Sequence, residues 1–270
     1  MPFHTDFRYQ TYLDADGNRK PNPEPQHIYG PVYHIGPLSV CAYLVETSDG
    51  LVVVDTGSES DSDLLPGNIR KLGFDPADVR IVLNTHWHWD HCGGNARLLE
   101  LSGASLAVHE LDADIVESGV YRGTRMFPPA PVARRLKDGD AIEQGGLAVR
   151  TIHTPGQSAG SVVFALTVDG PEGPCRVLFA GDATGFKHES RKSFEHLGYP
   201  GVCADYRRTV EILKGLQFDL LLPGHPHQVF KEMRADGSPF VTPDQWLQAV
   251  EKRHGLMERF VSRYPQYLDW

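Results

Sequence analysis

The stretch Thr85-His86-Trp87-His88-Trp89-Asp90-His91-Cys92-Gly93-Gly94 places three histidines and one aspartate within six residues. An apolar run at 79–83 precedes this stretch, and a helix-forming run at 95–101 follows it. The order predicts a buried strand, a loop and a helix, with the polar side chains on the loop, where functional groups commonly lie. Because neutral imidazole and carboxylate are ligands for zinc and similar ions, the stretch predicts a metal site.

The composition limits the classes of protein to which the chain can belong. With 270 residues, 40% of them hydrophobic and 23% charged, it fits one large globular domain or two small ones. The net charge of −9 argues against nucleic acid as a general partner, since phosphate binding requires a basic surface. No membrane-spanning helix is predicted, because no run approaches 18 apolar residues. The first residues lack the pattern of a secretion signal, so we expect a cytoplasmic protein.

The order of predicted elements indicates an α/β fold. Residues 1–27 are polar and rich in proline, and they predict an N-terminal arm that is either mobile or packed over the domain. The apolar patterns then predict strands at 32–35, 38–46, 51–55, 79–83, 105–108, 147–153, 161–168, 175–180 and 218–222, and helices at 68–72, 95–101, 109–118 and 203–216. Residues 121–132 are expected to be irregular.

The last predicted helix has a clear start. Thr242-Pro243-Asp244-Gln245 combines an N-cap, a proline at the first helical position and a capping-box glutamine. A stripe on one helical face is expected to pack in the core, and it consists of Trp246, Val250, Met257 and Val261. Strands and helices thus recur in two similar halves. They predict a single domain over 28–270, an αββα sandwich of two mixed sheets face to face with helices outside.

The candidate metal ligands all follow the ends of predicted strands, and we expect them to converge on one edge of the sandwich. They are Asp55, His86, His88, Asp90, His91, either His153 or Gln157, Asp182 and His225. The spacing of the loop allows His86 and His88 to hold one ion. Asp90, His91 and His225 are then expected to hold a second ion.

A carboxylate between the two groups completes this hypothesis. Asp182 can offer one oxygen to each cation. Two ions about 3.5–4 Å apart would generate a bridging hydroxide at neutral pH and polarise an acyl or phosphoryl oxygen. Asp90 is the expected catalytic residue, because it can orient that nucleophile or return a proton to the leaving group.

Five short motifs carry a resemblance to a known family. They are Asp55-Thr56-Gly57, the His86–His91 loop, Thr154-Pro155-Gly156, Gly181-Asp182 and Pro223-Gly224-His225. With them, nearly the whole chain from residue 28 on resembles the metallo-β-lactamase superfamily, which implies an αββα sandwich and metal-dependent hydrolysis. Several stretches look closest to the third subclass of true metallo-β-lactamases: Phe127-Pro128-Pro129, Lys137-Asp138-Gly139-Asp140, Ala204-Asp205-Tyr206-Arg207-Arg208, His225-Pro226 and Ser238-Pro239-Phe240-Val241.

The chain departs from the pattern of that subclass at two positions. Where the family usually has a histidine after Thr-Pro-Gly, this chain has Gln157, whose amide oxygen is a harder and weaker ligand for zinc than imidazole. Either Gln157 faces the metal or His153 partly compensates, and the first site is expected to be weak or selective. In addition, the subclass lacks the bridging aspartate, whereas Asp182 resembles that of relatives that open lactones, thioesters or phosphodiesters.

These features predict a metal-dependent hydrolase. Two Zn²⁺ ions are expected, with Mn²⁺ or Fe²⁺ as other candidates. The predicted partner is a small-molecule acyl substrate whose cyclic amide or ester, a β-lactam or a lactone, or a related acyl bond is opened. The alternative is a single-ion or degenerate protein of the same fold with little hydrolase activity. Nothing in the sequence predicts an oligomeric state.

Overall fold

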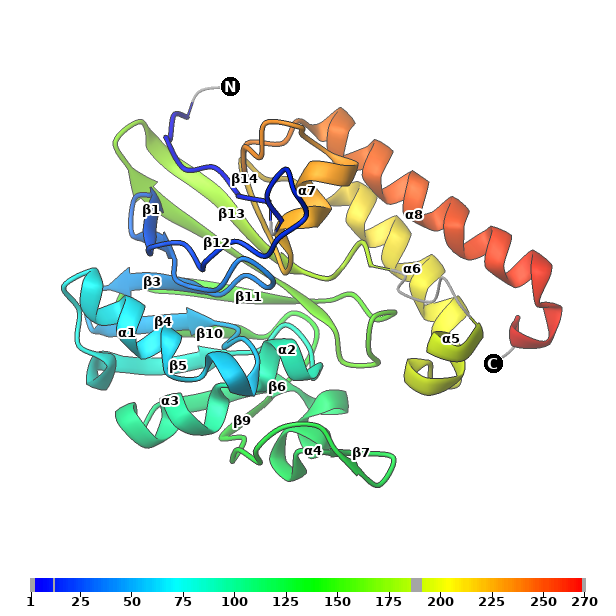
Figure 1. The fold of residues 1–270 in the computed structure, drawn as a ribbon, viewed down its shortest axis with the longest axis horizontal. Coiled ribbons are helices and arrows are strands. Elements are labelled where there is room, and N and C mark those ends of the chain that lie inside the picture. The colour runs from blue at the N-terminus through cyan, green and yellow to red at the C-terminus, as the bar shows by residue number, and fades with distance from the viewer. Residues whose placement is uncertain (1–2, 12, 186–190, 269–270) are drawn as a thin grey trace.

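Two mixed β-sheets form the centre of the fold, as Figure 1 shows for the computed structural model, which describes residues 3–11, 13–185 and 191–268. The first sheet has the order β1 (Gln26–Tyr29), β2 (Val32–His34), β3 (Tyr43–Thr47), β4 (Gly50–Val54), β5 (Val79–Leu83), β6 (Ser105–His109) and β9 (Arg134–Leu136). The second has the order β10 (Ala141–Gln144), β11 (Leu147–His153), β12 (Val162–Gly170), β13 (Gly173–Gly181) and β14 (Leu220–Pro223). A small hairpin pairs β7 (Val120–Tyr121) with β8 (Thr124–Arg125).

Alternating side chains divide the core into three layers. Successive residues of a strand point to opposite faces, so Val52 and Val54 of β4 enter the core between the sheets, while Val53 faces the outer helices. In the same way Phe164 of β12 faces the core between the sheets and Val163 faces outward. Both sheets are therefore apolar on both faces, which requires helices outside each.

The helices supply these outer layers (Figure 1). The helices of the described residues are α1 (Leu64–Lys71), α2 (Trp89–Cys92), α3 (Asn95–Ser102), α4 (Glu110–Ser118), α5 (Arg191–Leu197), α6 (Val202–Gly215), α7 (Pro226–Glu232) and α8 (Pro243–Arg263). Of these, α7 contributes Val229 to the core between the sheets. Helices α1, α3 and α4 pack on the first sheet, and α6 and α8 pack on the second. The predicted αββα sandwich is thus confirmed. None of the helices in the described ranges is both long and apolar enough to cross a membrane.

The start of α8 agrees with its sequence. The Gln245 backbone N–H donates to the Thr242 hydroxyl at 3.2 Å, and the Thr242 N–H donates to Gln245 Oε1 at 2.9 Å, which completes the capping box. The predicted stripe is buried against the second sheet: Trp246, Val250, Met257 and Val261.

Two local predictions were wrong. Residues 38–42 were expected to form the start of a strand, yet β3 begins at Tyr43. Leu38 and Cys41 are buried, and the Cys41 N–H donates to the Gly224 carbonyl at 2.7 Å. The apolar pattern here reflects burial of a loop and not strand pairing. Within 121–132, expected to be irregular, the chain instead forms part of the β7–β8 hairpin.

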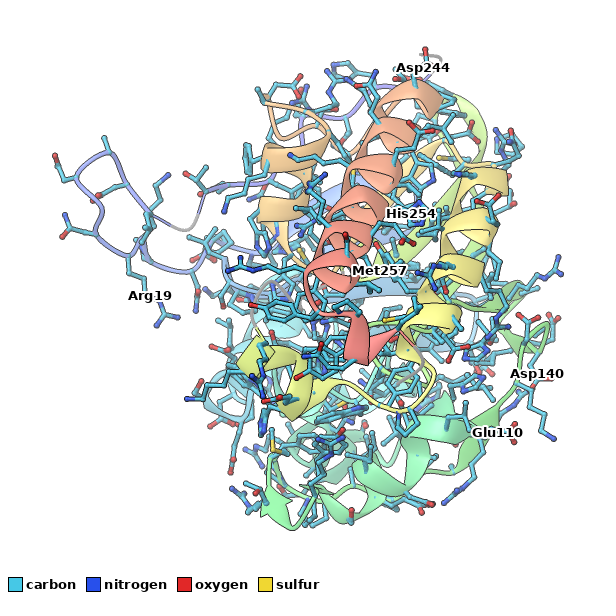
Figure 2. All side chains as sticks on the ribbon, turned by 90° about the vertical axis from the view of Figure 1, so that its right-hand side faces the viewer. Arg19, Glu110, Asp140, Asp244, His254 and Met257 are labelled. Atoms are coloured by element: carbon cyan, nitrogen blue, oxygen red, sulfur yellow. The ribbon has the colours of Figure 1, made fainter. Side chains whose placement is uncertain are left out.

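The described part of the N-terminal arm is packed at one end and projects at the other. Phe7 and Tyr9 enter the core between the sheets. The Tyr9 hydroxyl lies 2.8 Å from that of Tyr43, which in turn donates to the Pro223 carbonyl at 2.7 Å. Figure 2 shows the loop with Arg19 standing away from the rest of the chain. The arm is therefore linked through Tyr43 to the end of β14.

Candidate metal centre

Four strands deliver the candidate ligands to one edge. In the first sheet β4 and β5 run parallel, and in the second β13 and β14 do. Each of the four ends at a polar motif: Asp55 follows β4, the His86–His91 loop follows β5, Asp182 follows β13, and Gly224-His225 follows β14. Because parallel strands end on the same side, their motifs meet, as ligand sites of α/β sheets generally do.

A first candidate pocket is formed by four of the predicted residues: His86, His88, Gln157 and Asp182. His86 Nε2 lies 3.1 Å from His88 Nδ1 and 4.0 Å from Asp182 Oδ2. The amide nitrogen of Gln157 lies 3.2 Å from His88 Nδ1 and 2.9 Å from Asp182 Oδ2. All four side chains are buried.

A second candidate pocket is formed by Asp90, His91 and His225 together with Asp182. His225 Nε2 lies 3.4 Å from Asp90 Oδ2 and 3.6 Å from Asp182 Oδ1. His91 Nε2 lies 4.0 Å from Asp90 Oδ2. Asp182 Oδ2 thus faces His86 and Gln157 of the first pocket, and Oδ1 faces His225 of the second. His91 also lies close to the first group, because ligand atoms of His86, His91 and Asp182 are within 4.8 Å of one another.

Hydrogen bonds on the far side of the rings hold their orientation. Asp55 adopts a φ of 58°, and its Oδ2 lies 2.8 Å from His91 Nδ1 and accepts from the Thr85 hydroxyl at 2.7 Å. His225 Nδ1 lies 2.7 Å from the Ser39 carbonyl oxygen. An acceptor at Nδ1 keeps a proton there, so in the neutral form of either ring the lone pair is on Nε2, toward the pocket.

The charge and the donor atoms of the centre fit a divalent cation. Burial lowers the pKa of His91, but the carboxylates of Asp55, Asp90 and Asp182 outweigh it and raise that pKa to about 9. Among the described residues, His91 Nε2 and Gln157 Oε1 are buried without a hydrogen-bond partner, which is rare for polar atoms. The imidazole nitrogens and carboxylates form a donor set that suits zinc.

Two glycines permit the close approach of the strand ends. A Cβ at Gly224 would lie 2.8 Å from both Asp182 Oδ1 and His91 Cε1. A Cβ at Gly181, where φ is +49°, would lie 2.7 Å from Thr85. Any side chain at these positions would displace the centre.

Asp112 of α4 joins the two loops of the first pocket and was not predicted from the sequence. Its Oδ2 accepts from the Trp87 N–H at 3.0 Å and from the Ser158 hydroxyl, and its Oδ1 accepts from the Gly160 N–H at 2.8 Å. Burial raises its pKa to about 6. The signal in the sequence is an acid on the apolar face of a helix, because Asp112 shares that face with Val116. Gln228 of α7 was not predicted either, and its Nε2 donates to Asp182 Oδ1 at 2.7 Å.

The structure distinguishes between Gln157 and His153 as the candidate ligand of the first pocket. His153 Nε2 lies 2.8 Å from the Ala159 carbonyl, and its ring stacks on His109 at 4.1 Å. It therefore faces neither pocket, whereas Gln157 lies within the first. Of the loop tryptophans, Trp87 is buried and Trp89 is 52% exposed.

Comparison with known proteins agrees with this geometry. Residues 35–225 match the sequence model of a family described as the metallo-beta-lactamase superfamily. Among curated relatives, an atrochrysone carboxyl ACP thioesterase of Cryptosporiopsis is 30% identical over 52% of this chain and 37% of the relative. A hydroxyacylglutathione hydrolase of Hyphomonas neptunium is 29% identical over 37% of this chain and 39% of the relative. The chain thus matches well under half the length of either.

The solved structures include a neighbour of nearly the same length. BJP-1, a subclass B3 metallo-beta-lactamase of Bradyrhizobium japonicum, superposes with a TM-score of 0.79 and 29% identity over 92% of this chain and 96% of that one. The predicted resemblance to the third subclass is confirmed by this match. The chain belongs to the metallo-beta-lactamase superfamily.

Proposed function

We propose that the chain is a hydrolase that holds two divalent ions, zinc in the first instance, and cleaves an acyl bond of a small molecule. The observation that carries the proposal is the division of one buried carboxylate between two groups of ligand atoms. Asp182 Oδ2 lies 4.0 Å from His86 Nε2, and Asp182 Oδ1 lies 3.6 Å from His225 Nε2. A carboxylate placed in this way is suited to bridge two cations.

Each proposed ion has its own protein ligands in addition to Asp182. His86, His88 and Gln157 would hold the first. Asp90, His91 and His225 would hold the second. A pair of ions of this kind supplies a nucleophile at neutral pH and polarises the oxygen of the bond that is attacked.

Asp90 is the proposed catalytic residue of the chain. Its side chain is 16% exposed, whereas the side chains of His86, His91 and Asp182 are fully buried. Its Oδ2 can therefore meet both the ligand cluster and an entering substrate. In that position Oδ2 can orient the attacking water, take its proton and return the proton to the leaving group, as general acid–base catalysis requires.

The proposed substrate is a β-lactam, a lactone or a related acyl compound such as a thioester. The named relatives are a lactamase, a thioesterase and a hydroxyacylglutathione hydrolase, and all three names describe hydrolysis of an acyl bond. Asp182 favours a lactone or thioester, because it departs from the pattern of the third subclass.

A single-ion protein is the second candidate, and one observation favours it. The nitrogen of the Gln157 amide, not its oxygen, faces His88 Nδ1 and Asp182 Oδ2. In that orientation Gln157 offers no lone pair to an ion in the first pocket.

Metal content followed by a substrate panel tests the proposal. After reconstitution with zinc or manganese, elemental analysis should find two ions per chain, one ion would favour the second candidate, and none would refute both. The panel consists of nitrocefin, an acyl-homoserine lactone, a thioester and bis-p-nitrophenyl phosphate. Asp90→Asn should lower kcat on the best substrate by about 10²-fold or more. Asp114→Asn, at an exposed carboxylate of α4, is the matched control. Full activity of Asp90→Asn would contradict the assigned role.

A further inference from the structure

Three hydrogen bonds join the loop before β3 to the end of β14, where the proposed ligand His225 lies. Their partners run in register, with residues 39, 41 and 43 opposite residues 225, 224 and 223. Two of the bonds use the backbone of the loop. The Cys41 N–H donates to the Gly224 carbonyl at 2.7 Å, and the Ser39 carbonyl oxygen lies 2.7 Å from His225 Nδ1. The third bond uses a side chain, that of residue 43.

This third bond belongs to a chain of hydroxyl groups that begins in the N-terminal arm. The Tyr43 hydroxyl donates to the Pro223 carbonyl at 2.7 Å, so its only hydrogen is used there. The Tyr9 hydroxyl, 2.8 Å from that of Tyr43, is therefore the donor of their contact. The bonds run in one direction, and in a buried environment each polarises and strengthens the next. Burial raises the pKa of both tyrosines well above its ordinary range, so both hydroxyl groups keep their protons.

Aromatic packing fixes the arm at the start of this relay, which consists of Tyr9, Tyr43 and the Pro223 carbonyl. The rings of Phe7 and Tyr9 pack edge to face with their centres 4.8 Å apart. The ring of the buried His34 lies 5.7 Å from Phe7, 6.3 Å from Tyr9 and 5.7 Å from Tyr43. If Tyr43 turned away from Pro223, the Tyr9 hydroxyl would lose its acceptor in a buried place. The docked arm therefore holds Tyr43 against the end of β14.

The backbone at the end of β14 passes directly beside ligands of the second pocket. A Cβ at Gly224 would lie 2.8 Å from both Asp182 Oδ1 and His91 Cε1. A shift of the Pro223 carbonyl by a few tenths of an ångström therefore changes the position of His225 relative to these ligands. The relay controls where this carbonyl lies.

We propose that Tyr43 is a positioning residue for His225 and that Tyr9 acts through it, so that the docked N-terminal arm is part of the metal centre. The inference rests on the two-ion centre of the proposed function. Loss of either hydroxyl leaves the ligand atoms of the centre unchanged and alters only their geometry. Docking of the arm and binding of an ion in the second pocket then favour each other.

Removal of single hydroxyl groups from the full chain tests the relay. Tyr43→Phe should lower the affinity for one zinc ion about tenfold or more and leave the affinity for the other unchanged, as measured by competition with a chromophoric chelator. Tyr9→Phe should lower the same affinity about threefold. The double variant should bind no more weakly than Tyr43→Phe, because a residue that acts only through another contributes nothing once that residue is lost.

Tyr29→Phe is the matched control. The hydroxyl of this buried tyrosine donates to the Gly173 carbonyl at 3.1 Å, at the opposite end of β13 from Asp182, and its loss should change neither affinity. The visible spectrum of the cobalt(II) protein reports the geometry of the ligands. It should shift in Tyr43→Phe and Tyr9→Phe and stay unchanged in Tyr29→Phe.

Hydrogen exchange of the metal-free protein gives a readout that needs no ion. The Gly224 N–H donates to the Gly181 carbonyl at 2.6 Å. It should exchange about tenfold faster in Tyr43→Phe than in the wild type or in Tyr29→Phe, because the end of β14 opens more often without the relay.

The outcomes separate the relay from the proposed function. Unchanged affinity in Tyr43→Phe, equal loss at both ions, the same loss in Tyr29→Phe or additive losses in the double variant would each overturn the inference. If Tyr43→Phe does not fold, Tyr9→Phe decides by zinc affinity and Gly224 exchange. A wild type that binds no ion would refute the proposed function, and Gly224 exchange would then decide on the relay. Two ions and hydrolysis, with unchanged affinity in Tyr43→Phe, would refute the relay alone.

Discussion

Asp112 provides the sharpest quantitative test of how the centre is held. This carboxyl is 1% exposed, and its pKa rises on folding from 3.8 to about 6 because of burial. The pKa of the Asp112 carboxyl is higher in the folded state than in the unfolded state. Its contribution to stability is therefore fully present below pH 3.8, the unfolded pKa, and is lost as the pH rises through about 6, the folded pKa. The difference of 2.2 pH units corresponds to about 3 kcal/mol.

Replacing Asp112 by asparagine removes this titration. Asparagine keeps one oxygen acceptor, but its amide group would meet either the Trp87 or the Gly160 N–H, donor against donor. The free energy of unfolding of the wild type, relative to that of Asp112→Asn, should therefore fall by about 2.4 kcal/mol between pH 4 and pH 7.5, because part of the change already occurs below pH 4. At any single pH the variant also loses one hydrogen bond, which is worth about 1–3 kcal/mol.

Urea unfolding of the metal-free protein at several pH values measures this difference. The control is Asp114→Asn, at an exposed carboxylate of the same helix that pairs with Arg135 at 2.7 Å, and its difference from the wild type should stay within about 1 kcal/mol at all pH values. A constant difference for Asp112→Asn, or one in which the wild type gains stability as the pH rises, would refute the reasoning. Because Asp112 joins the loops of the first pocket, Asp112→Asn should also lower zinc affinity about 10-fold to 100-fold.

Three further predictions concern the ligands and their supports. Gln157→His should raise zinc affinity of the first pocket at least about tenfold, as measured by competition with a chromophoric chelator. Gly224→Ala should abolish tight binding of at least one ion, because its Cβ would lie 2.8 Å from Asp182 Oδ1, and near-ultraviolet circular dichroism should show that the fold is retained. Asp55→Ala removes the acceptor 2.8 Å from His91 Nδ1 and should lower zinc affinity about 10-fold to 100-fold, whereas unchanged affinity would show that the ring needs no anchor.

Local patterns predicted the elements whose signals are themselves local. The strand Val79–Leu83, which leads into the metal loop, and the strand Leu147–His153 were predicted with their observed bounds. The capping box at Thr242 requires only contacts within four residues, so its prediction was also confirmed. The prediction for the segment 38–42 failed for the opposite reason: the backbone partner of Cys41 is Gly224, far along the chain. An apolar pattern does not show whether a buried segment pairs as a strand.

The candidate centre shows the same difference between features with a local signal and features that depend on distant contacts. The ligand types and their places at strand ends were evident from the sequence, because metal chemistry restricts them to few residue types. The residues that hold these ligands in place were not evident from the sequence, because the contacts between supporting residue and ligand loop join distant segments. Asp112 lies 48 residues from Gly160, and Ser39 lies 186 residues from His225. Only the packed fold shows that these residues orient the centre.

The geometry of Gln157 explains why the two proposed ions should not be equivalent. Its amide nitrogen donates to Asp182 Oδ2 at 2.9 Å, while its oxygen is buried without a hydrogen-bond partner among the described residues. To coordinate an ion through oxygen, the amide must turn over and give up this charge-assisted bond, which is worth about 1.5–3 kcal/mol. An imidazole at the same position has no such bond to lose. His91 and His225, in contrast, are already held by acceptors at Nδ1 with Nε2 toward the second pocket. The second pocket is therefore preorganised, the first is not, and ion binding should begin at Asp90, His91 and His225.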